Sequence, residues 1–310
     1  MYIWQLGWYR DNMSSLDNLE TTFFYWKGGL HMKRSWEKDL PRKQYEQFKK
    51  IEQSQPWFTV YDIGHDVYAI YEPYQFQEVI SYLIMGEDKA ILLDTGNGIG
   101  DMKQLVNEVW KKELIVVNSH SHFDHVGSNY QFDTVHVFNH PTMIDVMEHG
   151  IDQDVIDRNY GPETYSYQSP IDYQPMSYRR CNYQTFNEDV VFDLGRRRFR
   201  IIYTPGHSMD SIMLVNDEEK LLFTGDTYYP AQLYCFTEGT FDTYVETMKK
   251  LASVYGDYTL ITSHNEPLRS GKVLQEVSKF FQKIKNNEIE CKNVDGLKEY
   301  EWNSLNLLMK

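Results

Sequence analysis

The chain reads His120-Ser121-His122-Phe123-Asp124-His125 directly after a short apolar run, Leu114–Val117. Four of these six side chains are of types that bind metal ions. In an extended segment, residues two apart share a face, so His120 and His122 can point the same way. The turn that follows would bring Asp124 and His125 to a second position nearby. The stretch therefore predicts a loop at a strand end that can serve two adjacent metals.

Three further segments have the same form, because each is an apolar or β-branched run that ends in His or Asp. They are Tyr203-Thr204-Pro205-Gly206-His207, Phe223-Thr224-Gly225-Asp226 and Ile261-Thr262-Ser263-His264. A fourth run ends in Asp94, which we expect to orient ligands rather than to bind metal itself. Five of the ten histidines fall in these motifs, and this favours a metal centre over scattered surface histidines.

In this order, the motifs HxHxDH, TPGHS, TGD and SH resemble those of the metallo-β-lactamase superfamily, specifically its glyoxalase-II-like and lactonase-like hydrolases. The resemblance covers about residues 56–285. Nitrogen and carboxylate ligands without thiolate suit zinc, the metal that we expect, and they would also accept iron or manganese. The resemblance implies that one metal is bound by His120, His122 and His207, a second by Asp124, His125 and His264, and both by a bridging Asp226.

The resemblance also implies an α/β fold, the four-layer αββα sandwich, with the metals at one edge between two sheets. The sequence pattern agrees with this fold. Short apolar runs separated by turn residues predict strands at residues 57–61, 67–71, 79–85 and 90–94. Apolar residues at three- and four-residue spacing predict helices at residues 102–112 and 242–255, and another is expected at 271–286.

Two segments stand apart from this pattern. Residues 1–55 form an extension rich in tryptophan and tyrosine, ahead of a domain at 56–310. Two interpretations of the extension stay open: it packs on the domain as a wrapper, or it forms a homodimer contact or a wall of the substrate pocket. About residues 150–189 form an insert with many tyrosines and prolines, which we interpret as a lid over the metals.

Composition limits the partners that we expect. The net charge of −14 disfavours non-specific binding to nucleic acid or to an anionic membrane. Residues 1–10 show neither a basic leader nor an apolar core, so we expect no signal peptide, and no apolar run of about 18 residues is present. Three widely spaced cysteines do not indicate a disulfide framework. We therefore expect a cytoplasmic protein whose partner is a small-molecule substrate.

We expect a dinuclear hydrolase of a small-molecule ester, thioester or lactone. Two cations that share a water would generate a bridging hydroxide as nucleophile, and Asp124 would orient it and carry its proton to the leaving group. Tyr229 is a candidate donor to the oxygen that gains charge, because lactonases of the family resemble this chain in placing a tyrosine three residues after the bridging aspartate. Tyr228 is a candidate substrate contact.

Three alternatives stay open. The same metals would serve a phosphodiesterase, an iron-dependent oxidoreductase similar to persulfide dioxygenases would keep a similar motif, and a metal-stabilised binding module would need no catalysis. His122 stands where diiron flavoproteins of the superfamily carry glutamate, which disfavours that group. No C-terminal basic cluster for glutathione is evident, which disfavours glutathione thioesters. Two zinc ions per chain would favour hydrolysis, and one redox-active iron would favour an oxygenase.

Overall fold

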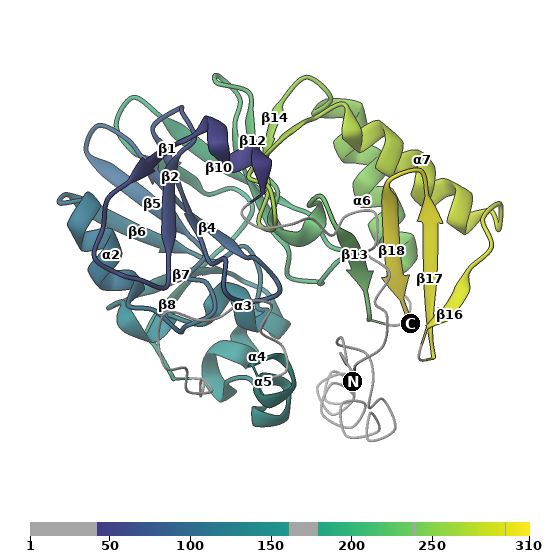
Figure 1. Cartoon of the computed structure of the whole chain (residues 1–310), viewed down its shortest axis with the longest axis horizontal. Helices are drawn as coiled ribbons and strands as arrows, with labels where there is room; N and C mark the ends of the chain where they lie inside the picture. The colour runs from purple at the N-terminus through teal and green to yellow at the C-terminus, as the bar shows by residue number, and fades with distance from the viewer. Residues whose placement is uncertain (1–41, 161–178, 238–239, 295) are drawn as a thin grey trace.

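The computed structural model describes residues 42–160, 179–237, 240–294 and 296–310. Within these ranges the chain forms three sheets and the helices that cover them. In Figure 1 an eight-stranded sheet lies on the left, and a four-stranded sheet lies on the right with α6 and α7. Residues 1–41 of the extension lie outside the described residues, so the roles predicted for them stay predictions, whereas residues 49–51 pair with residues 60–62 in the first sheet.

The first sheet has eight strands in the order β1 to β8. Neighbours pair antiparallel from β1 to β5 and parallel from β5 to β8. Parallel pairing places the carboxyl ends of β5 and β6 side by side, which brings the loops that follow them together. The strands are β1 (Lys49–Ile51), β2 (Thr59–Asp62), β3 (Val67–Tyr71), β4 (Ile80–Met85), β5 (Lys89–Leu93), β6 (Glu113–Val117), β7 (Val135–Phe138) and β8 (Tyr183–Phe186).

The second sheet has six strands in the order β15-β14-β12-β11-β10-β9. Strands β12 and β14 pair parallel, so the segments that lead to Asp226 and His264 leave the sheet at the same end. The strands are β9 (Val191–Asp193), β10 (Arg198–Tyr203), β11 (Ile212–Asn216), β12 (Leu221–Phe223), β14 (Thr259–Ile261) and β15 (Leu268–Ser270).

The two sheets pack face to face through one apolar core, in which Tyr82 meets Phe223 edge to face with ring centroids 5.6 Å apart. Helices α2 and α4 cover the outer face of the first sheet, and α6 and α7 cover that of the second. The predicted αββα layers are therefore confirmed. The helices are α2 (Met102–Val109), α3 (Phe123–Val126), α4 (Pro141–His149), α5 (Gln153–Tyr160), α6 (Phe241–Val254) and α7 (Val273–Lys285), with 3-10 turns η2 (Lys43–Gln47), η3 (Asn129–Gln131) and η5 (Gly225–Thr227).

A third sheet, which the sequence patterns do not predict, lies beside α6 and α7. Its edge strand β13 pairs parallel with β18, and its inner side chains join the core under the two helices. A buried polar contact reinforces this pairing, because the Gln232 side-chain amide donates to Glu299 at 2.8 Å and to Asn306 at 2.7 Å. The strands are β13 (Gln232–Cys235), β16 (Lys292–Val294), β17 (Leu297–Trp302) and β18 (Leu305–Met309).

The structure also differs from the sequence pattern at two further places. Helix α2 ends at Val109 rather than near residue 112, because Trp110 is already extended at φ −134° and ψ 134° as the chain turns into β6. The predicted insert contributes to the domain at both ends: Phe186 of β8 joins the core between the sheets, and Ile156 of α5 packs against Phe123. The lid interpretation thus falls on residues 161–178, which lie outside the described residues. None of the described helices is long and apolar enough to cross a membrane.

Candidate metal centre

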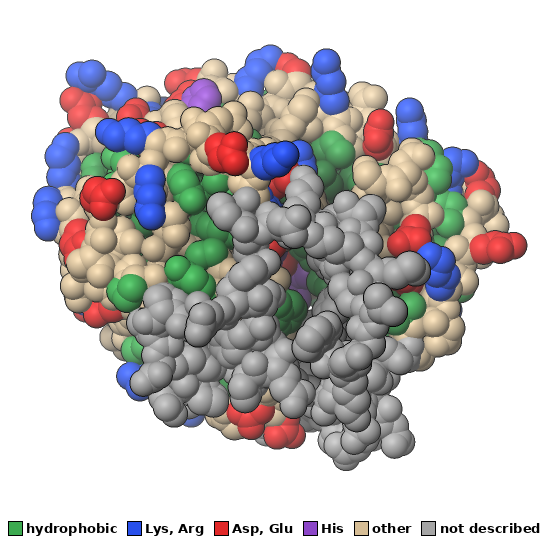
Figure 2. Space-filling view, viewed as in Figure 1, with side chains coloured by type: hydrophobic (Ala, Val, Ile, Leu, Met, Phe, Trp, Pro, Cys, Tyr) green, Lys and Arg blue, Asp and Glu red, His purple; other side chains and the backbone are tan. Residues whose placement is uncertain are grey.

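The structure brings all seven predicted ligands into one cluster, and six of them are buried. Each lies just beyond the carboxyl end of a strand, where the chain leaves the sheet and its side chains are free to turn toward one another. Figure 2 shows histidine and acidic side chains deep in the middle of one face of the molecule. The loop after β6 and helix α3 supply His120, His122, Asp124 and His125, the loop after β10 supplies His207, η5 supplies Asp226 and the loop after β14 supplies His264.

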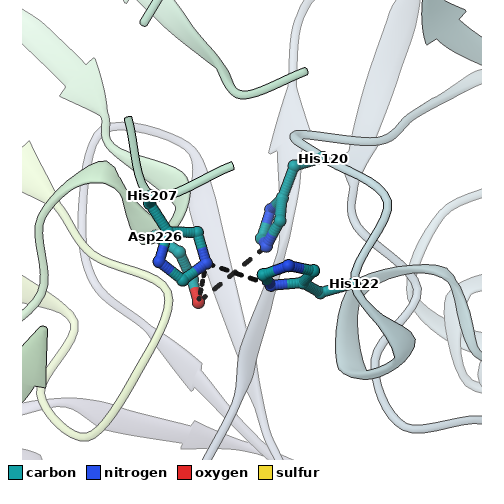
Figure 3. Close-up of side chains that lie close together, drawn as sticks. All are labelled: His120, His122, His207 and Asp226. Carbon is teal, nitrogen blue, oxygen red and sulfur yellow. Dashed lines mark hydrogen bonds and ion pairs between the residues drawn. The ribbon is translucent and has the colours of Figure 1, made fainter. Parts of the chain in front are cut away.

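The first donor group consists of His120, His122, His207 and Asp226, with ligand atoms all within 4.8 Å of one another. Figure 3 shows these four side chains pointing toward a common centre. His207 Nε2 lies 3.0 Å from His122 Nδ1 and 3.4 Å from Asp226 Oδ2, and His120 Nε2 lies 3.9 Å from the same oxygen. Three imidazoles and one carboxylate oxygen at these distances form the donor set that suits zinc.

The second donor group consists of Asp124, His125 and His264. Asp124 Oδ2 lies 3.7 Å from His125 Nε2 and 3.6 Å from His264 Nε2. Asp226 joins this group to the first, because its Oδ1 lies 3.2 Å from His125 Nε2 and 3.1 Å from His264 Nε2 while its Oδ2 lies near His207. One carboxylate therefore contacts both groups.

Hydrogen bonds on the outer side of the rings fix the orientation of the histidines. His125 Nδ1 lies 2.9 Å from Asp94 Oδ2, and Asp94 also accepts from the Ser119 backbone at 2.7 Å. His207 Nδ1 donates to Tyr234 O at 3.2 Å, and His264 Nδ1 donates to Gln77 O at 2.8 Å. A proton held on the outer nitrogen leaves the lone pair of the inner nitrogen free for a metal. Asp94 thus contacts the outer nitrogen of His125 and orients this ring, and it does not belong to either donor group.

The inner atoms fit a cation. His120 Nε2, Asp124 Oδ2 and His125 Nε2 are buried and have no hydrogen-bond partner. Leaving a buried polar atom without a partner costs roughly 1–3 kcal/mol, so three such atoms in one place require an explanation. A divalent ion bound by these atoms would supply it, and imidazole and carboxylate are the donors that it needs.

The pKa shifts of the histidines differ between the two donor groups. Burial lowers the pKa of His120 well below its ordinary value, and burial also lowers the pKa of His122. Burial likewise lowers the pKa of His207 to about 3. These three imidazoles are therefore neutral at pH 7, which is the form that binds metal.

In the second group, burial alone would lower the pKa of His125 and His264, but the charges of Asp226 and Asp124 raise the pKa of both. Burial alone would raise the pKa of Asp226, and the two histidines instead lower it well below its ordinary value. The Asp226 carboxylate is thus anionic and attracts protons to these two rings. A metal that binds here has to displace those protons.

The structure places the two predicted tyrosines in the apolar cluster beside α6 and α7. The Tyr229 ring lies against the His264 ring, with centroids 4.7 Å apart, and its hydroxyl donates to Gln232 O at 2.8 Å. Tyr228 is buried, and burial raises its pKa to about 12. A role for Tyr229 as donor to a reacting oxygen requires that its hydroxyl leave Gln232 during turnover.

Sequence reasoning missed Asp210, which is fully buried and whose carboxylate oxygens have no hydrogen-bond partner. Burial lowers the pKa of His140, and the charge of Asp210 opposes that shift. The charge of Asp210 also raises the pKa of His122, against the effect of burial. The sequence signal that could have found it is an acidic residue three positions after His207.

Comparisons with known proteins agree with this geometry. The family model described as the metallo-beta-lactamase superfamily matches residues 77–264, more than half of the 310 residues. The chain is 25% identical over 194 residues to acyl-coenzyme A thioesterase MBLAC2 of Homo sapiens, a match that covers 57% of this chain and 68% of the relative. It is 24% identical over 212 residues to hydroxyacylglutathione hydrolase of Erwinia tasmaniensis, which covers 66% of this chain and 70% of the relative.

Among solved structures, a beta-lactamase domain protein from Burkholderia ambifaria matches with a TM-score of 0.55 at 15% sequence identity and covers 77% of each chain. This likeness supports the fold alone. The family match contains all seven residues of the two donor groups. The chain belongs to the metallo-beta-lactamase superfamily.

Proposed function

We propose that this chain is a metal-dependent hydrolase that cleaves a thioester bond of a small-molecule substrate with two zinc ions. The observation that carries the proposal is the position of Asp226, which contacts both donor groups. Two groups of nitrogen and oxygen donors that share one carboxylate match the arrangement of hydrolytic two-metal sites. His120, His122 and His207 would hold one ion, and Asp124, His125 and His264 the other.

When bound, the two ions would supply a hydroxide nucleophile at neutral pH and polarise the attacked carbonyl. Side chains of the protein would orient the water and the substrate. Asp124 Oδ2 is buried, has no hydrogen-bond partner and lies 3.6 Å from His264 Nε2, and in our proposal this carboxylate accepts a proton from water and passes it to the leaving thiolate. Tyr229 remains our candidate for the donor to the carbonyl oxygen, and its contact with the His264 ring supports that position.

A covalent mechanism through cysteine has less support. Burial raises the pKa of Cys181 to about 11, and burial also raises the pKa of Cys235. Both thiols are therefore protonated at neutral pH, whereas the thiolate is the nucleophilic form. Attack by water is the mechanism that these residues favour.

The choice of a thioester rests on the relatives. Two of them are named for hydrolysis of an acyl group carried on coenzyme A or on glutathione, and both carriers present a thiol. These names support a thioester over a lactone or a phosphodiester. A cytoplasmic setting is part of the same proposal, because widely spaced cysteines suit a reducing compartment.

A substrate comparison with the zinc-loaded full chain tests the proposal. The substrates compared by kcat/KM would be acyl-coenzyme A, acyl-glutathione, an aryl ester, a lactone and an aryl phosphodiester. A thiol reagent would follow hydrolysis of the two thioesters, and release of the phenol or acid product would follow hydrolysis of the other three. We expect the highest kcat/KM for an acyl-coenzyme A thioester, and no activity in the Asp226→Ala control. Preference for the phosphodiester, or oxygen consumption by protein that carries one iron per chain, would overturn it.

A further inference from the structure

His264 is held by the end of the loop that connects β3 to β4. Its Nδ1 donates to Gln77 O at 2.8 Å, which directs Nε2 toward Asp226. The main chain on either side of His264 is tied to the same segment: Ile80 N donates to Ser263 O at 2.7 Å, and Asn265 N donates to Glu78 O at 3.1 Å. The position of His264 therefore depends on residues 77–80.

Two residues at this junction have unfavourable backbone conformations. Glu78 has φ 49° and Asn265 has φ 66°, both in the left-handed region. Glu78 directly follows Gln77, the acceptor for His264, and Asn265 directly follows His264 itself. Such conformations are uncommon for residues other than glycine and persist where the surroundings hold them in place.

Arg42 contacts both of these residues. Its Nε donates to Glu78 Oε2 at 2.8 Å, and one terminal nitrogen donates both to Glu78 Oε1 and to Asn265 Oδ1, the latter at 2.7 Å. Arg42 is 2% exposed and Glu78 is 7% exposed, so the ion pair is shielded from water. Tyr71 donates its hydroxyl to the same carboxylate. A planar guanidinium binds the carboxylate through two nitrogens at once, whereas a lysine offers a single ammonium nitrogen.

The segment that carries Arg42 is itself anchored. The Gln44 side chain donates to Leu268 O at 3.1 Å and accepts from Leu268 N at 3.4 Å, so it is fixed to the strand that follows the His264 loop. Tyr45 is buried and stacks on Tyr71, with ring centroids 4.5 Å apart. These contacts fix Arg42 without any contribution from a metal. Arg42 also lies ahead of residues 77–264, which the family model matches.

We propose that Arg42 is a positioning residue for His264, and that the affinity of the second donor group for its metal depends on the ion pair between Arg42 and Glu78. The first donor group does not depend on this pair, because His207 is held by Tyr234 O instead. The inference rests on the proposed function in one respect only, that Asp124, His125 and His264 bind a metal. It does not depend on the substrate.

Metal binding to the full chain tests this role directly. Wild type, Arg42→Met, Arg42→Lys and the double variant Arg42→Met/Glu78→Gln would be stripped of metal and titrated with Zn²⁺ against a competing chelator. We expect Arg42→Met to weaken one of two zinc equivalents by about 10- to 100-fold, as is typical for a residue that orients a ligand, and to leave the other unchanged. Arg42→Lys should fall between wild type and Arg42→Met. His264→Ala identifies which equivalent belongs to the second group.

The matched control is Arg197→Met. Arg197 makes a similar, partly buried ion pair, in which its Nε donates to Glu219 at 2.6 Å. This pair lies at the amino ends of β10 and β12, whereas the ligands lie beyond the carboxyl ends. The substitution should lower thermal stability and leave both zinc affinities unchanged. If Arg42→Met does not fold, the double variant decides, because it leaves no single charge buried alone.

Each other outcome overturns a distinct claim. Wild-type affinity at the second equivalent in Arg42→Met and in the double variant would remove the positioning role. Equal weakening of both equivalents would show a general loss of stability instead. A wild-type chain that binds one zinc would contradict the two-metal proposal and this inference with it.

Discussion

The two donor groups share Asp226, but different parts of the chain hold them in place. In the first, His207 is held by a main-chain carbonyl of β13, whose position is set by pairing with β18. In the second, His264 is held by a loop that a buried ion pair from Arg42 fastens. Main-chain pairing tolerates side-chain changes, whereas an ion pair is lost with a single substitution. The second group should therefore be the more easily disturbed.

Asp226→Ala should have the largest effect. Because Asp226 contacts both groups, its loss should weaken both metals, whereas His122→Ala should weaken only the first. We expect hydrolysis to fall by at least roughly a thousandfold in either variant, since metal-supplied charge stabilisation is worth several kcal/mol. The metal content of purified variants and their kcat/KM provide the check. A His122→Ala protein with two metals and full activity would contradict the assignment of ligands.

Tyr229→Phe should have the next largest effect, and it tests a residue that touches both regions. Its ring contacts His264, and its hydroxyl donates to Gln232 in β13. If the hydroxyl turns to the reacting oxygen, kcat should fall by about 10² to 10³ with unchanged metal content. Tyr228→Phe is the control. Equally small effects at both positions would mean that the Tyr229 hydroxyl stays on Gln232 and that both tyrosines are packing residues.

The pH dependence of zinc affinity should differ between the two donor groups, with a smaller effect than that of the substitutions above. The pKa of His207 is lowered to about 3, so the first group displaces no proton from it near neutral pH. The pKa values of His125 and His264 are raised, so acid favours the protonated rings and zinc must compete with protons. Affinity at the second group should therefore fall as pH decreases, by roughly tenfold per pH unit for each proton displaced. Parallel pH profiles for both equivalents, measured by chelator competition, would contradict this difference.

Tyr234→Ala should have the smallest effect. His207 is held by the carbonyl oxygen of Tyr234 and not by its side chain, and any residue in β13 supplies that oxygen. Both zinc affinities should stay close to wild type, in contrast to Arg42→Met. Selective loss of the first zinc would show that the Tyr234 side chain, rather than the strand, places His207.

Much of the centre was predictable because its ligands follow strands. An apolar run that ends in His or Asp carries a local signal, which singled out His120, His207 and Asp226, and the family resemblance implied that they bind metal at one centre. Short-range periodicity predicted the individual strands and helices, and the family resemblance implied their arrangement in four layers.

The supports of the ligands carried no such signal. Gln77 and Tyr234 act through backbone carbonyls, which every residue possesses, so their sequence says nothing about the contact. Arg42 acts across more than two hundred positions, on Asn265, and only the folded chain brings these residues together. The third sheet was missed because its pairing of β13 with β18 is also long-range.

The pairing of β13 with β18 also bears on how the protein folds. The carbonyl that holds His207 lies in a strand that is placed by residues 305–309, and the loop that holds His264 is fastened by residue 42. The centre is therefore closed by contacts that span almost the whole described chain, and such contacts are slow to form because long loops must close first. During synthesis, the ligands at 120–125 leave the ribosome long before their last supports. Tight metal binding should therefore be a late event, reached only after residue 309 has joined the fold.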